Sequence, residues 1–424
     1  MTNTTHVLPN GVTVVAENMS TVRSVAFGLW VRGGSRAEGA HGAAHFLEHM
    51  MFRGTNTRSG ADIAYQVDAI GGHINAFTSK EHTCYYTVTL DEHADTAMEI
   101  IADMFFNSRL DEDDISKEKA IIHEEIDMVE DTADDLVYEL LQQSVWEGSQ
   151  DMAHPILGTK ESVGGLERGI LERHLRAHPS DVVIAVAGNI GSIDALLPKL
   201  ERFFGGVWPG DRVPVSRSGV TSYRPCITIR CKPIEQLHLL LGFPGTTMGS
   251  AQRYDMAVLN TILGAGMSSV LFQRIREEMG LAYSVYSHNS SFTDTGLLYI
   301  YAGVSPSNAN EALRAILEEV AGLLKINETQ LRHAQAQIKS SLLLGLESTQ
   351  SRMMRLGRGY ISLGRTTDID EISSGIQAVS LESLQRLAYE VLKNSRMSMS
   401  AIGPLTKDEE RVLTDLLGGY GLTA

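Results

Sequence analysis

The strongest constraint on the fold is that the chain presents the same order of elements twice. The first half predicts a hairpin-like opening, a helix, a second helix that stops at two glycines, a strand pair, two long helices and a closing strand. These elements lie at 12–15 and 25–31, 45–52, 60–70, 74–78 and 82–90, 94–107 and 111–130, and 182–187. The second half predicts strands at 227–230 and 238–243, helices at 253–263 and 269–279, strands at 283–289 and 296–304, and helices at 308–324 and 328–344.

Strand pairs that alternate with helix pairs are typical of the α+β class. We therefore predict two tandem, structurally similar α/β sandwich domains, each with an antiparallel sheet packed with helices. A chain of 424 residues is also too long for one ordinary core. The stretch 205–225 is rich in Gly, Pro and Ser, which indicates a seam. The predicted domains are 1–212 and 213–424.

The composition of the chain indicates in which cellular compartment to expect the protein. The chain is 43% hydrophobic and 21% charged, and no run approaches the roughly 18 apolar residues that cross a bilayer. Met1–His6 is short and polar, which leaves no room for a signal peptide before the first strand. The three cysteines, Cys84, Cys226 and Cys231, are too few for a disulfide framework. We expect a cytoplasmic protein with no membrane segment.

The formal net charge is −16. Nucleic-acid binding needs basic surface that displaces counterions, so nucleic acid is not an expected partner. An acidic interior that attracts basic peptides and an acidic surface that keeps the protein in solution both remain open.

The segment His45-Phe46-Leu47-Glu48-His49 can bind a metal ion. On a helix, His45 and His49 project from the same face, and Glu48 lies beside them, close enough to transfer a proton. His41 lies one turn earlier, but Gly42 indicates that the helix has barely begun there. A hydrolytic zinc site has three protein ligands and one open position, so two histidines leave one ligand to find. Read alone, the segment could equally be an ordinary surface helix.

The acidic helix predicted at 111–130 offers the missing ligand. Glu118 and Glu125 are two helical turns apart and share a face, whereas His123 and Glu124 point elsewhere. A carboxylate from a second helix is a common complement to two histidines.

Taken together, these motifs make the chain resemble the pitrilysin/insulinase family, the inverzincin metallopeptidases, and most of all its bacterial branch similar to mitochondrial processing peptidase. The order His-x-x-Glu-His is the inverse of the more common His-Glu-x-x-His. The resemblance extends along the whole chain, through Leu8–Gly11, Gly71–Thr78, His154–Thr159, Gly266–Ser269 and Arg276–Ser284.

The resemblance implies a zinc metalloendopeptidase with one Zn²⁺ per chain. Glu125 stands where the family has its third ligand, beside His45 and His49. Glu48 would be the general base that takes a proton from water. Glu118 stands at the family's second characteristic glutamate, where it would orient a ligand histidine; an ordinary solvated carboxylate is the alternative.

The resemblance also implies where a peptide substrate binds. Asn75 and Ala76, on an alternating strand, would contact its backbone, and Arg276 and Tyr283 would contact its carbonyl near the transition state. The chain is similar to half of the family's clamshell chamber, so Arg276 and Tyr283 would reach the zinc of a partner chain. We expect a homodimer; a heterodimer with a related subunit is the alternative.

Two other functions compete with this interpretation. A catalytically silent scaffold subunit of the same fold would have lost a ligand or the base, whereas His45, Glu48, His49 and Glu125 are all present. A peptide-binding chamber with structural zinc would need a fourth protein ligand, and the sequence offers none that is evident.

Overall fold

The computed structural model describes residues 3–146, 149–177, 182–206, 222–392 and 396–419. The chain forms two compact units. The first comprises Met1–Asp127, His154–Arg217 and Leu343–Asp368, and the second comprises Met128–Ala153, Ser218–Leu342 and Ile369–Ala424. The predicted boundary between 212 and 213 lies outside the described residues.

The first unit contains a six-stranded sheet in the order β1-β2-β6-β3-β5-β4. Its strands are β1 (Thr4–Val7), β2 (Thr13–Asn18), β3 (Ser24–Arg32), β4 (His73–Thr78), β5 (His82–Leu90) and β6 (Val182–Gly188). The predicted hairpin-like opening is wrong, because β2 and β3 do not pair: β6 lies between them, parallel to β2 and antiparallel to β3. The sheet is therefore mixed.

The second unit repeats this arrangement in five strands, in the order β7-β11-β8-β10-β9. They are β7 (Ile227–Cys231), β8 (Leu237–Pro244), β9 (Ala282–Ser291), β10 (Gly296–Val304) and β11 (Ser398–Gly403). Its last strand, β11, pairs in parallel with β7 and antiparallel with β8, just as β6 does with β2 and β3. The α+β class and the two similar sandwiches are thus confirmed, with one parallel pair in each sheet.

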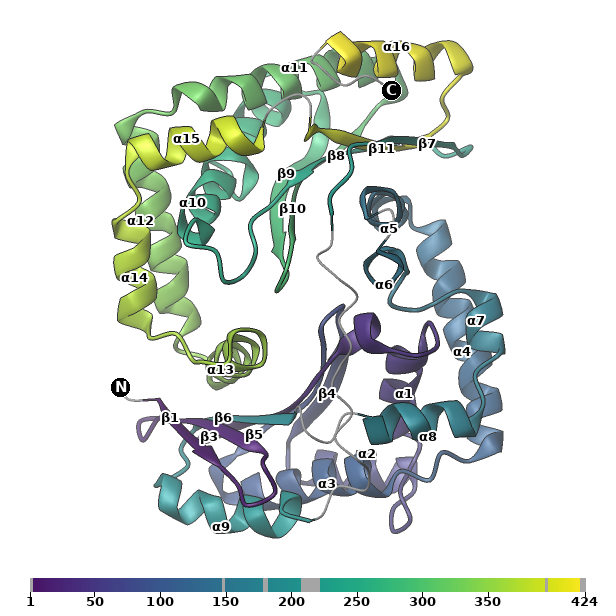
Figure 1. The fold of residues 1–424 in the computed structure, drawn as a ribbon, viewed down its shortest axis with the longest axis vertical. Helices are drawn as coiled ribbons and strands as arrows, with labels where there is room; N and C mark the ends of the chain where they lie inside the picture. Colours follow the sequence, from purple (N-terminus) through teal and green to yellow (C-terminus); the bar gives the residue numbers. More distant parts are fainter. Residues whose placement is uncertain (1–2, 147–148, 178–181, 207–221, 393–395, 420–424) are drawn as a thin grey trace. The chain divides into compact units, whose positions relative to one another are not determined.

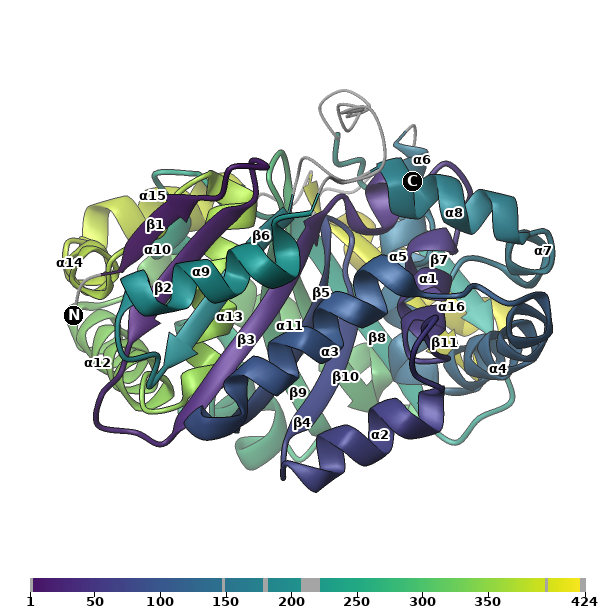
Figure 2. The same ribbon diagram turned by 90° about the horizontal axis from the view of Figure 1, so that it is seen from below.

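Helices cover both faces of each sheet (Figures 1 and 2). The helices within the first unit, or mostly so, are α1 (Ala43–Met51), α2 (Gly60–Ala69), α3 (Ala94–Asn107), α4 (Glu112–Asp131), α7 (Lys160–Gly164), α8 (Arg168–Ala177), α9 (Ile193–Phe204) and α13 (Thr349–Leu363). Those of the second are α5 (Ala133–Val145), α6 (Gln150–Ala153), α10 (Arg253–Gly264), α11 (Ala309–Gly322), α12 (Glu328–Gly345), α14 (Ile369–Gln377), α15 (Leu381–Val391) and α16 (Lys407–Gly419).

Alternation along the strands builds two separate cores on the first sheet. Val25, Phe27 and Leu29 of β3 point to one face and pack with α1, α3 and α9. Ala26 and Trp30 point to the other face, where α13 covers them. The metal motif lies on α1, so the first core holds that helix in place.

Each sheet takes one of its covering helices from the other half of the sequence. The first sheet is covered by α13, through Met353, Leu356 and Ile361. The second is covered by α5, whose Leu136, Val137 and Leu141 pack with its own core cluster. Sequence periodicity can show that a helix has an apolar face, but not which sheet that face will contact.

Glycines allow α13 to lie close to the sheet. A Cβ added to Gly357 would fall 2.1 Å from Nε1 of Trp30, and one added to Gly28 would fall 2.4 Å from Sδ of Met353. Both separations are far below van der Waals contact. The rigid Trp30 ring cannot yield easily to a side chain at position 357, whereas the flexible end of Met353 could move away from one at position 28.

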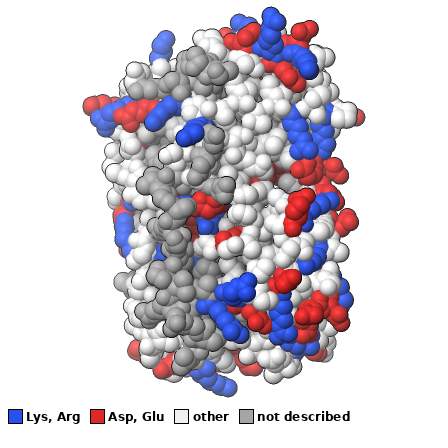
Figure 3. Space-filling model, turned by 45° about the vertical axis from the view of Figure 1, so that its right-hand side comes forward, with Lys and Arg blue, Asp and Glu red and all other residues white. Residues whose placement is uncertain are grey.

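The segment predicted as a helix at 269–279 is helical, but Phe272–Glu278 forms a π-helix. Hydrophobic periodicity does not distinguish this rare form from an α-helix. Among the described residues, no helix is long and apolar enough to cross a membrane. On the face drawn in Figure 3, acidic and basic side chains lie interspersed.

A buried cluster of charges joins α13 to the first sheet. Glu17 of β2 is 1% exposed, and its carboxylate binds Nη1 of Arg352 and, at 3.0 Å, Nη2 of Arg355. Both guanidinium groups come from α13. The cluster selects one position of the helix on the sheet, because any slide would leave a buried carboxylate unpaired.

We predict that Glu17→Gln lowers the free energy of unfolding by about 3 kcal/mol, because the buried ion pairs to two guanidinium groups lose their carboxylate. Equilibrium urea unfolding measures this. Asp95→Asn is the matched control: its pair with Lys199 is about half exposed, and such pairs contribute about 1 kcal/mol or less. An equal effect of the two changes would contradict the assignment.

Candidate metal centre

Helix α1 presents its polar face to α4. The helix begins at Ala43, directly after Gly42, as the glycine predicted. Phe46, Leu47 and Met50 are buried in the first core. Because these residues fix the apolar side of the helix, His45 and His49 lie on the side that faces Glu118 and Glu125.

The two histidines and Glu125 form a triangle of donor atoms. Oε2 of Glu125 lies 3.7 Å from Nε2 of His45 and 3.7 Å from Nε2 of His49. The ligand atoms of all three residues lie within 4.8 Å of one another, and among the described residues this is the one such group of three that could hold a metal ion. The structure thus brings the three predicted ligands together.

The triangle fits a zinc ion. At zinc–ligand distances of about 2.0–2.2 Å, neighbouring donors of a tetrahedral site are roughly 3.4 Å apart, close to the observed spacing. Oε2 of Glu125 is buried and lacks a hydrogen-bond partner among the described residues. A buried carboxylate oxygen without a partner is costly, and a cation at the centre of the triangle would satisfy it.

Glu118 sets the orientation of His49. Its side chain is 3% exposed, and its Oε2 accepts a hydrogen bond from Nδ1 of His49 at 3.0 Å. A carboxylate can only accept, so the ring proton of neutral His49 lies on Nδ1 and the lone pair of Nε2 faces Glu125. The other oxygen of Glu118 binds Nε of Arg53.

These contacts shift the pKa values in opposite directions. Burial acts to raise the pKa of Glu118, but the hydrogen bonds from His49 and Arg53 outweigh it and hold that pKa below its usual value. The hydrogen bond to Glu118 raises the pKa of His49. Burial lowers the pKa of His45 to about 4, so His45 is neutral, as a metal ligand must be, over the physiological range.

Glu48 lies beside the triangle and is fixed by a threonine. Oγ1 of Thr78, at the end of β4, donates to Oε2 of Glu48 at 2.5 Å. Burial raises the pKa of Glu48, and the Thr78 hydrogen bond only partly opposes it. A carboxylate with a raised pKa is a stronger base than an ordinary one.

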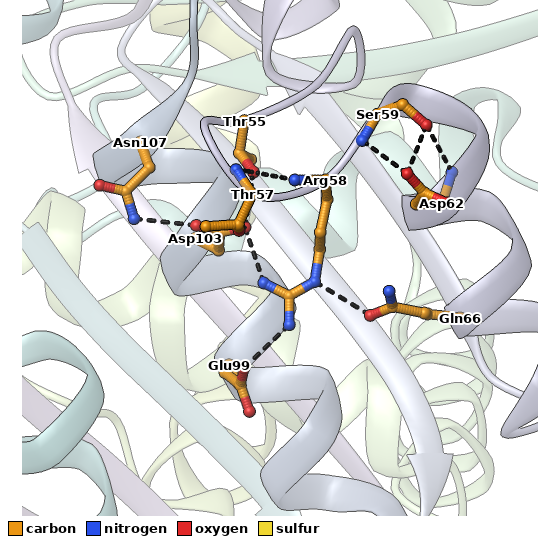
Figure 4. A network of polar contacts seen from close by, with 9 residues as sticks. All are labelled: Thr55, Thr57, Arg58, Ser59, Asp62, Gln66, Glu99, Asp103 and Asn107. Atoms are coloured by element: carbon orange, nitrogen blue, oxygen red, sulfur yellow. Dashed lines mark hydrogen bonds and ion pairs between the residues drawn. The ribbon is translucent and has the colours of Figure 1, made fainter.

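A polar network fixes the loop that joins α1 to α2 (Figure 4). Asp103 of α3 is buried, and its Oδ2 accepts from Oγ1 of Thr55 at 2.7 Å, Oγ1 of Thr57 at 2.9 Å and Nη1 of Arg58 at 2.7 Å. Arg53 begins this loop. The network therefore limits how far the guanidinium of Arg53 can move from Glu118.

A cavity of about 670 Å³ adjoins the triangle within the first unit. It is lined by Glu48, His49, Phe52, Arg53, Gly60, Ala61, Asn75, Asp114, Glu118 and Ile121. Asn75 belongs to β4, which stands last in the strand order and pairs only with β5 among the described strands. Its free edge can accept an added strand.

The structure places Arg276 and Tyr283 in the second unit and in contact with each other. The guanidinium carbon of Arg276 lies 4.6 Å from the ring centre of Tyr283 and 4.8 Å from that of Phe272. The Tyr283 side chain, on β9, is 80% exposed. Their predicted contact with a substrate stays a prediction.

Sequence reasoning missed three residues of this centre: Arg53, Thr78 and Asp103. Arg53 lies about one turn beyond His49, a spacing that could have flagged it. Thr78 and Asp103 are distant in sequence from the residues they contact, so no local pattern could have found them.

The depressed pKa of His45 predicts a pH effect on stability in metal-free protein. Between pH 6.5 and about 4 the unfolded chain binds a proton at this position and the folded chain does not, so stability falls as the pH falls. From pH 6.5 to 4.5 His45 should remove about 2 kcal/mol. Urea unfolding of chelator-treated protein at both pH values, with His45→Gln as comparison, measures the difference. Equal pH dependence of the two proteins would contradict it.

Comparison with known proteins places the chain in a family. Residues 13–160 match the family described as insulinase, peptidase family M16, and residues 174–338 match the one described as the peptidase M16 inactive domain. The chain is 43% identical to the uncharacterized zinc protease YmxG of Bacillus subtilis (strain 168), over 90% of this chain and 94% of the relative. It is 37% identical to the uncharacterized zinc protease SCO5738 of Streptomyces coelicolor, over 95% and 90% of the two chains.

Solved structures share the fold. The structure titled peptidase M16 inactive domain, from Pseudomonas fluorescens, superposes with a TM-score of 0.89 at 18% identity and covers 96% of this chain and 99% of its own. A protease from Helicobacter pylori gives 0.87 at 19% identity, with 95% and 99% covered. The chain belongs to the insulinase family, peptidase family M16.

Proposed function

We propose that the protein is a zinc-dependent metalloendopeptidase that cleaves peptides or unfolded segments. The observation that carries the proposal is the triangle of His45, His49 and Glu125 beside a half-buried, hydrogen-bonded Glu48. The names of the bacterial relatives as zinc proteases support it. In this proposal the N-terminal domain, 1–212, carries catalysis, and the C-terminal domain, 213–424, contributes substrate contacts.

His45, His49 and Glu125 would hold one zinc ion per chain through Nε2, Nε2 and a carboxylate oxygen. When bound, zinc polarises the scissile carbonyl and lowers the pKa of water at its open position to about 7. Three protein ligands leave that position open, which distinguishes a catalytic from a structural site.

Glu48 acts as the general base. Its Oε2 is occupied by the hydroxyl of Thr78, so the other oxygen, Oε1, takes the proton from the attacking water and passes it to the leaving nitrogen. The raised pKa of Glu48 favours the first transfer, because a stronger base accepts the proton from water more readily. The leaving nitrogen is a stronger base than a carboxylate, so it takes the proton in the second transfer.

Glu118 and Arg53 position His49. Glu118 fixes the Nδ1–H tautomer, and Arg53 keeps Glu118 ionised so that it remains an acceptor. Neither side chain needs to touch the peptide. Their contribution is to keep the Nε2 lone pair directed at the metal.

The peptide adds to the free edge of β4. An extended chain would form backbone hydrogen bonds along this strand, with Asn75 and Ala76 nearest the scissile bond. The cavity that Asn75 and Glu48 share would then receive a substrate side chain next to the metal triangle.

Arg276 and Tyr283 would stabilise the substrate carbonyl across a chamber formed by two copies of the chain. Their stacked contact and the exposure of Tyr283 leave a cationic and a hydroxyl donor available at one place. We propose a cytoplasmic homodimer in which each zinc site is completed by the partner.

Glu48→Gln should retain one zinc per chain and lower peptide hydrolysis by about 10³-fold, because the amide cannot accept the water proton. Metal analysis and cleavage of a peptide library mapped by mass spectrometry test this. Hydrolysis at the wild-type rate would exclude Glu48 as the base. If wild type and variant were equally inactive with zinc bound, a silent scaffold would replace the proposed enzyme.

Glu125→Ala should instead lower bound zinc, since it removes one of three ligands. Glu124→Gln is the matched control on the same helix, one residue away and outside the triangle. Equal zinc content in the two variants would contradict the third-ligand assignment.

Mixing two inactive variants tests the partner contribution. In a symmetric dimer, Glu48→Gln and Arg276→Ala subunits that complete each other's sites would restore about one active site in four after subunit exchange. If both defects act within one chain, the mixture should remain inactive. Size-exclusion chromatography with light scattering measures the oligomeric state independently.

A further inference from the structure

Helix α1 begins without a cap of its own. Its N-cap residue is Gly42, at φ 87°, which has no side chain to accept from the first N–H groups. The usual capping residues, Ser, Thr, Asp and Asn, cannot replace it at low cost, because a Cβ there would fall 2.8 Å from the carbonyl oxygen of Leu157. The first turn therefore needs an acceptor from elsewhere.

Glu38 supplies that acceptor. One carboxylate oxygen accepts from the backbone N–H of Gly42 at 2.7 Å, and the other accepts from the N–H of Ala44 at 2.9 Å. The Glu38 side chain is only 1% exposed. Burial raises its pKa to about 7, and the backbone hydrogen bonds only partly oppose that shift. The ionised form of this buried, desolvated carboxylate is stabilised by the N–H groups and the partial positive charge at the start of the helix.

A second segment closes over the same place. The ring of His154 stacks on that of His41 with centroids 3.5 Å apart, and the His154 carbonyl accepts from Nζ of Lys80. Gly158 approaches Gly42 so closely that a Cβ on it would lie 3.0 Å from the Cα of Gly42. The motif His154–Thr159, which the proposed catalytic mechanism does not use, thus packs against the start of α1 and against His41, whose Nδ1 lies 3.9 Å from Oε1 of Glu38.

The capped turn leads directly into the metal ligands. Ala44, whose N–H binds Glu38, immediately precedes His45 in the chain, and Glu48 follows within the next turn. Helix ends fray when their first N–H groups lack acceptors. Fraying at this end would move the imidazole of His45 relative to Glu125, and the triangle tolerates only a few tenths of an ångström of such movement.

We propose that Glu38 is a positioning residue: its buried carboxylate fixes the first turn of α1 and so holds His45 in place to bind the metal ion. The inference rests on the proposed function for the identity of the ion, but its geometry is independent of hydrolysis. Glu38 touches neither the peptide nor the metal. Its effect should appear in metal affinity and in kcat, with KM nearly unchanged.

Glu38→Gln is the near-isosteric test. The amide keeps one acceptor oxygen and turns an NH₂ group towards the second backbone N–H, so one hydrogen bond and the charge are lost. Zinc affinity, measured by competition with a chelator, should fall about tenfold or more. The exchange of the backbone amides of α1 should be faster in the metal-free variant, and kcat should fall while KM stays within about twofold.

Ser380→Ala is the matched control. It removes the capping box of α15 in the second unit, a comparable loss at a helix that carries no metal ligand, and should leave zinc affinity within about twofold of wild type. Wild-type zinc affinity in Glu38→Gln would overturn the proposal, even if the backbone amides of α1 exchanged faster with solvent. The Glu38 carboxylate would then stabilise the start of α1 without positioning His45 for the metal ion.

The outcomes separate this inference from the proposed function. If wild type binds zinc without cleaving peptides, the peptidase proposal fails, and the tenfold loss in the variant still supports Glu38. If wild type binds no zinc, the proposed metal centre fails, and unchanged exchange of the α1 amides in Glu38→Gln would overturn the capping role as well.

Discussion

The contact of Glu118 with His49 and Arg53 is the interaction on which the rest of the site depends. It joins α4 to α1 and to the loop that follows α1, three segments held in place by different parts of the first core. A carboxylate that accepts from an imidazole and a guanidinium also fixes the proton on Nδ1 of His49. Loss of this contact would remove the hydrogen bond that holds the His49 ring with Nε2 towards Glu125.

Three further contacts surround this one and hold the neighbouring segments of the site. The loop after α1 is held by Asp103, the base Glu48 by Thr78, and the start of α1 by Glu38. Each of these links is a buried or half-buried oxygen with specific donors, and each fixes one degree of freedom of a ligand or base. Buried polar groups lower the stability of the fold unless all of them have hydrogen-bond partners. They therefore favour the one geometry of the site in which every partner is in place.

Much of this could be predicted from the sequence, for stated physical reasons. Helix periodicity and glycine stops located α1 to α4 within one or two residues, and the spacing of His45, His49, Glu118 and Glu125 indicated shared helix faces. The order of strands could not be read in the same way. The strand β6 is buried along its whole length, so its composition does not reveal which neighbours it has, and adjacency in sequence wrongly suggested that β2 pairs with β3.

The covering helices and Thr78 escaped prediction for a common reason. An amphipathic pattern indicates that one face of a helix is buried, and a threonine at the end of a strand offers a hydroxyl group. Which sheet the helix covers, and which side chain the hydroxyl contacts, depend on the whole fold. The resemblance to a family supplied the role of Glu125, which spacing alone left open between two glutamates.

Each sheet is covered by a helix from the other half of the sequence, α13 on the first and α5 on the second, and this has a consequence for synthesis on the ribosome. The first sheet and all three proposed metal ligands emerge by residue 188, but α13, which covers Ala26 and Trp30 and pairs with Glu17, is complete only at Leu363. Translation adds about 5–20 residues per second, so one face of the first sheet lacks its covering helix for many seconds. The nascent chain therefore cannot finish its metal-bearing unit until α13 has been made, which couples maturation of the site to synthesis of the second unit's strands β7 to β10.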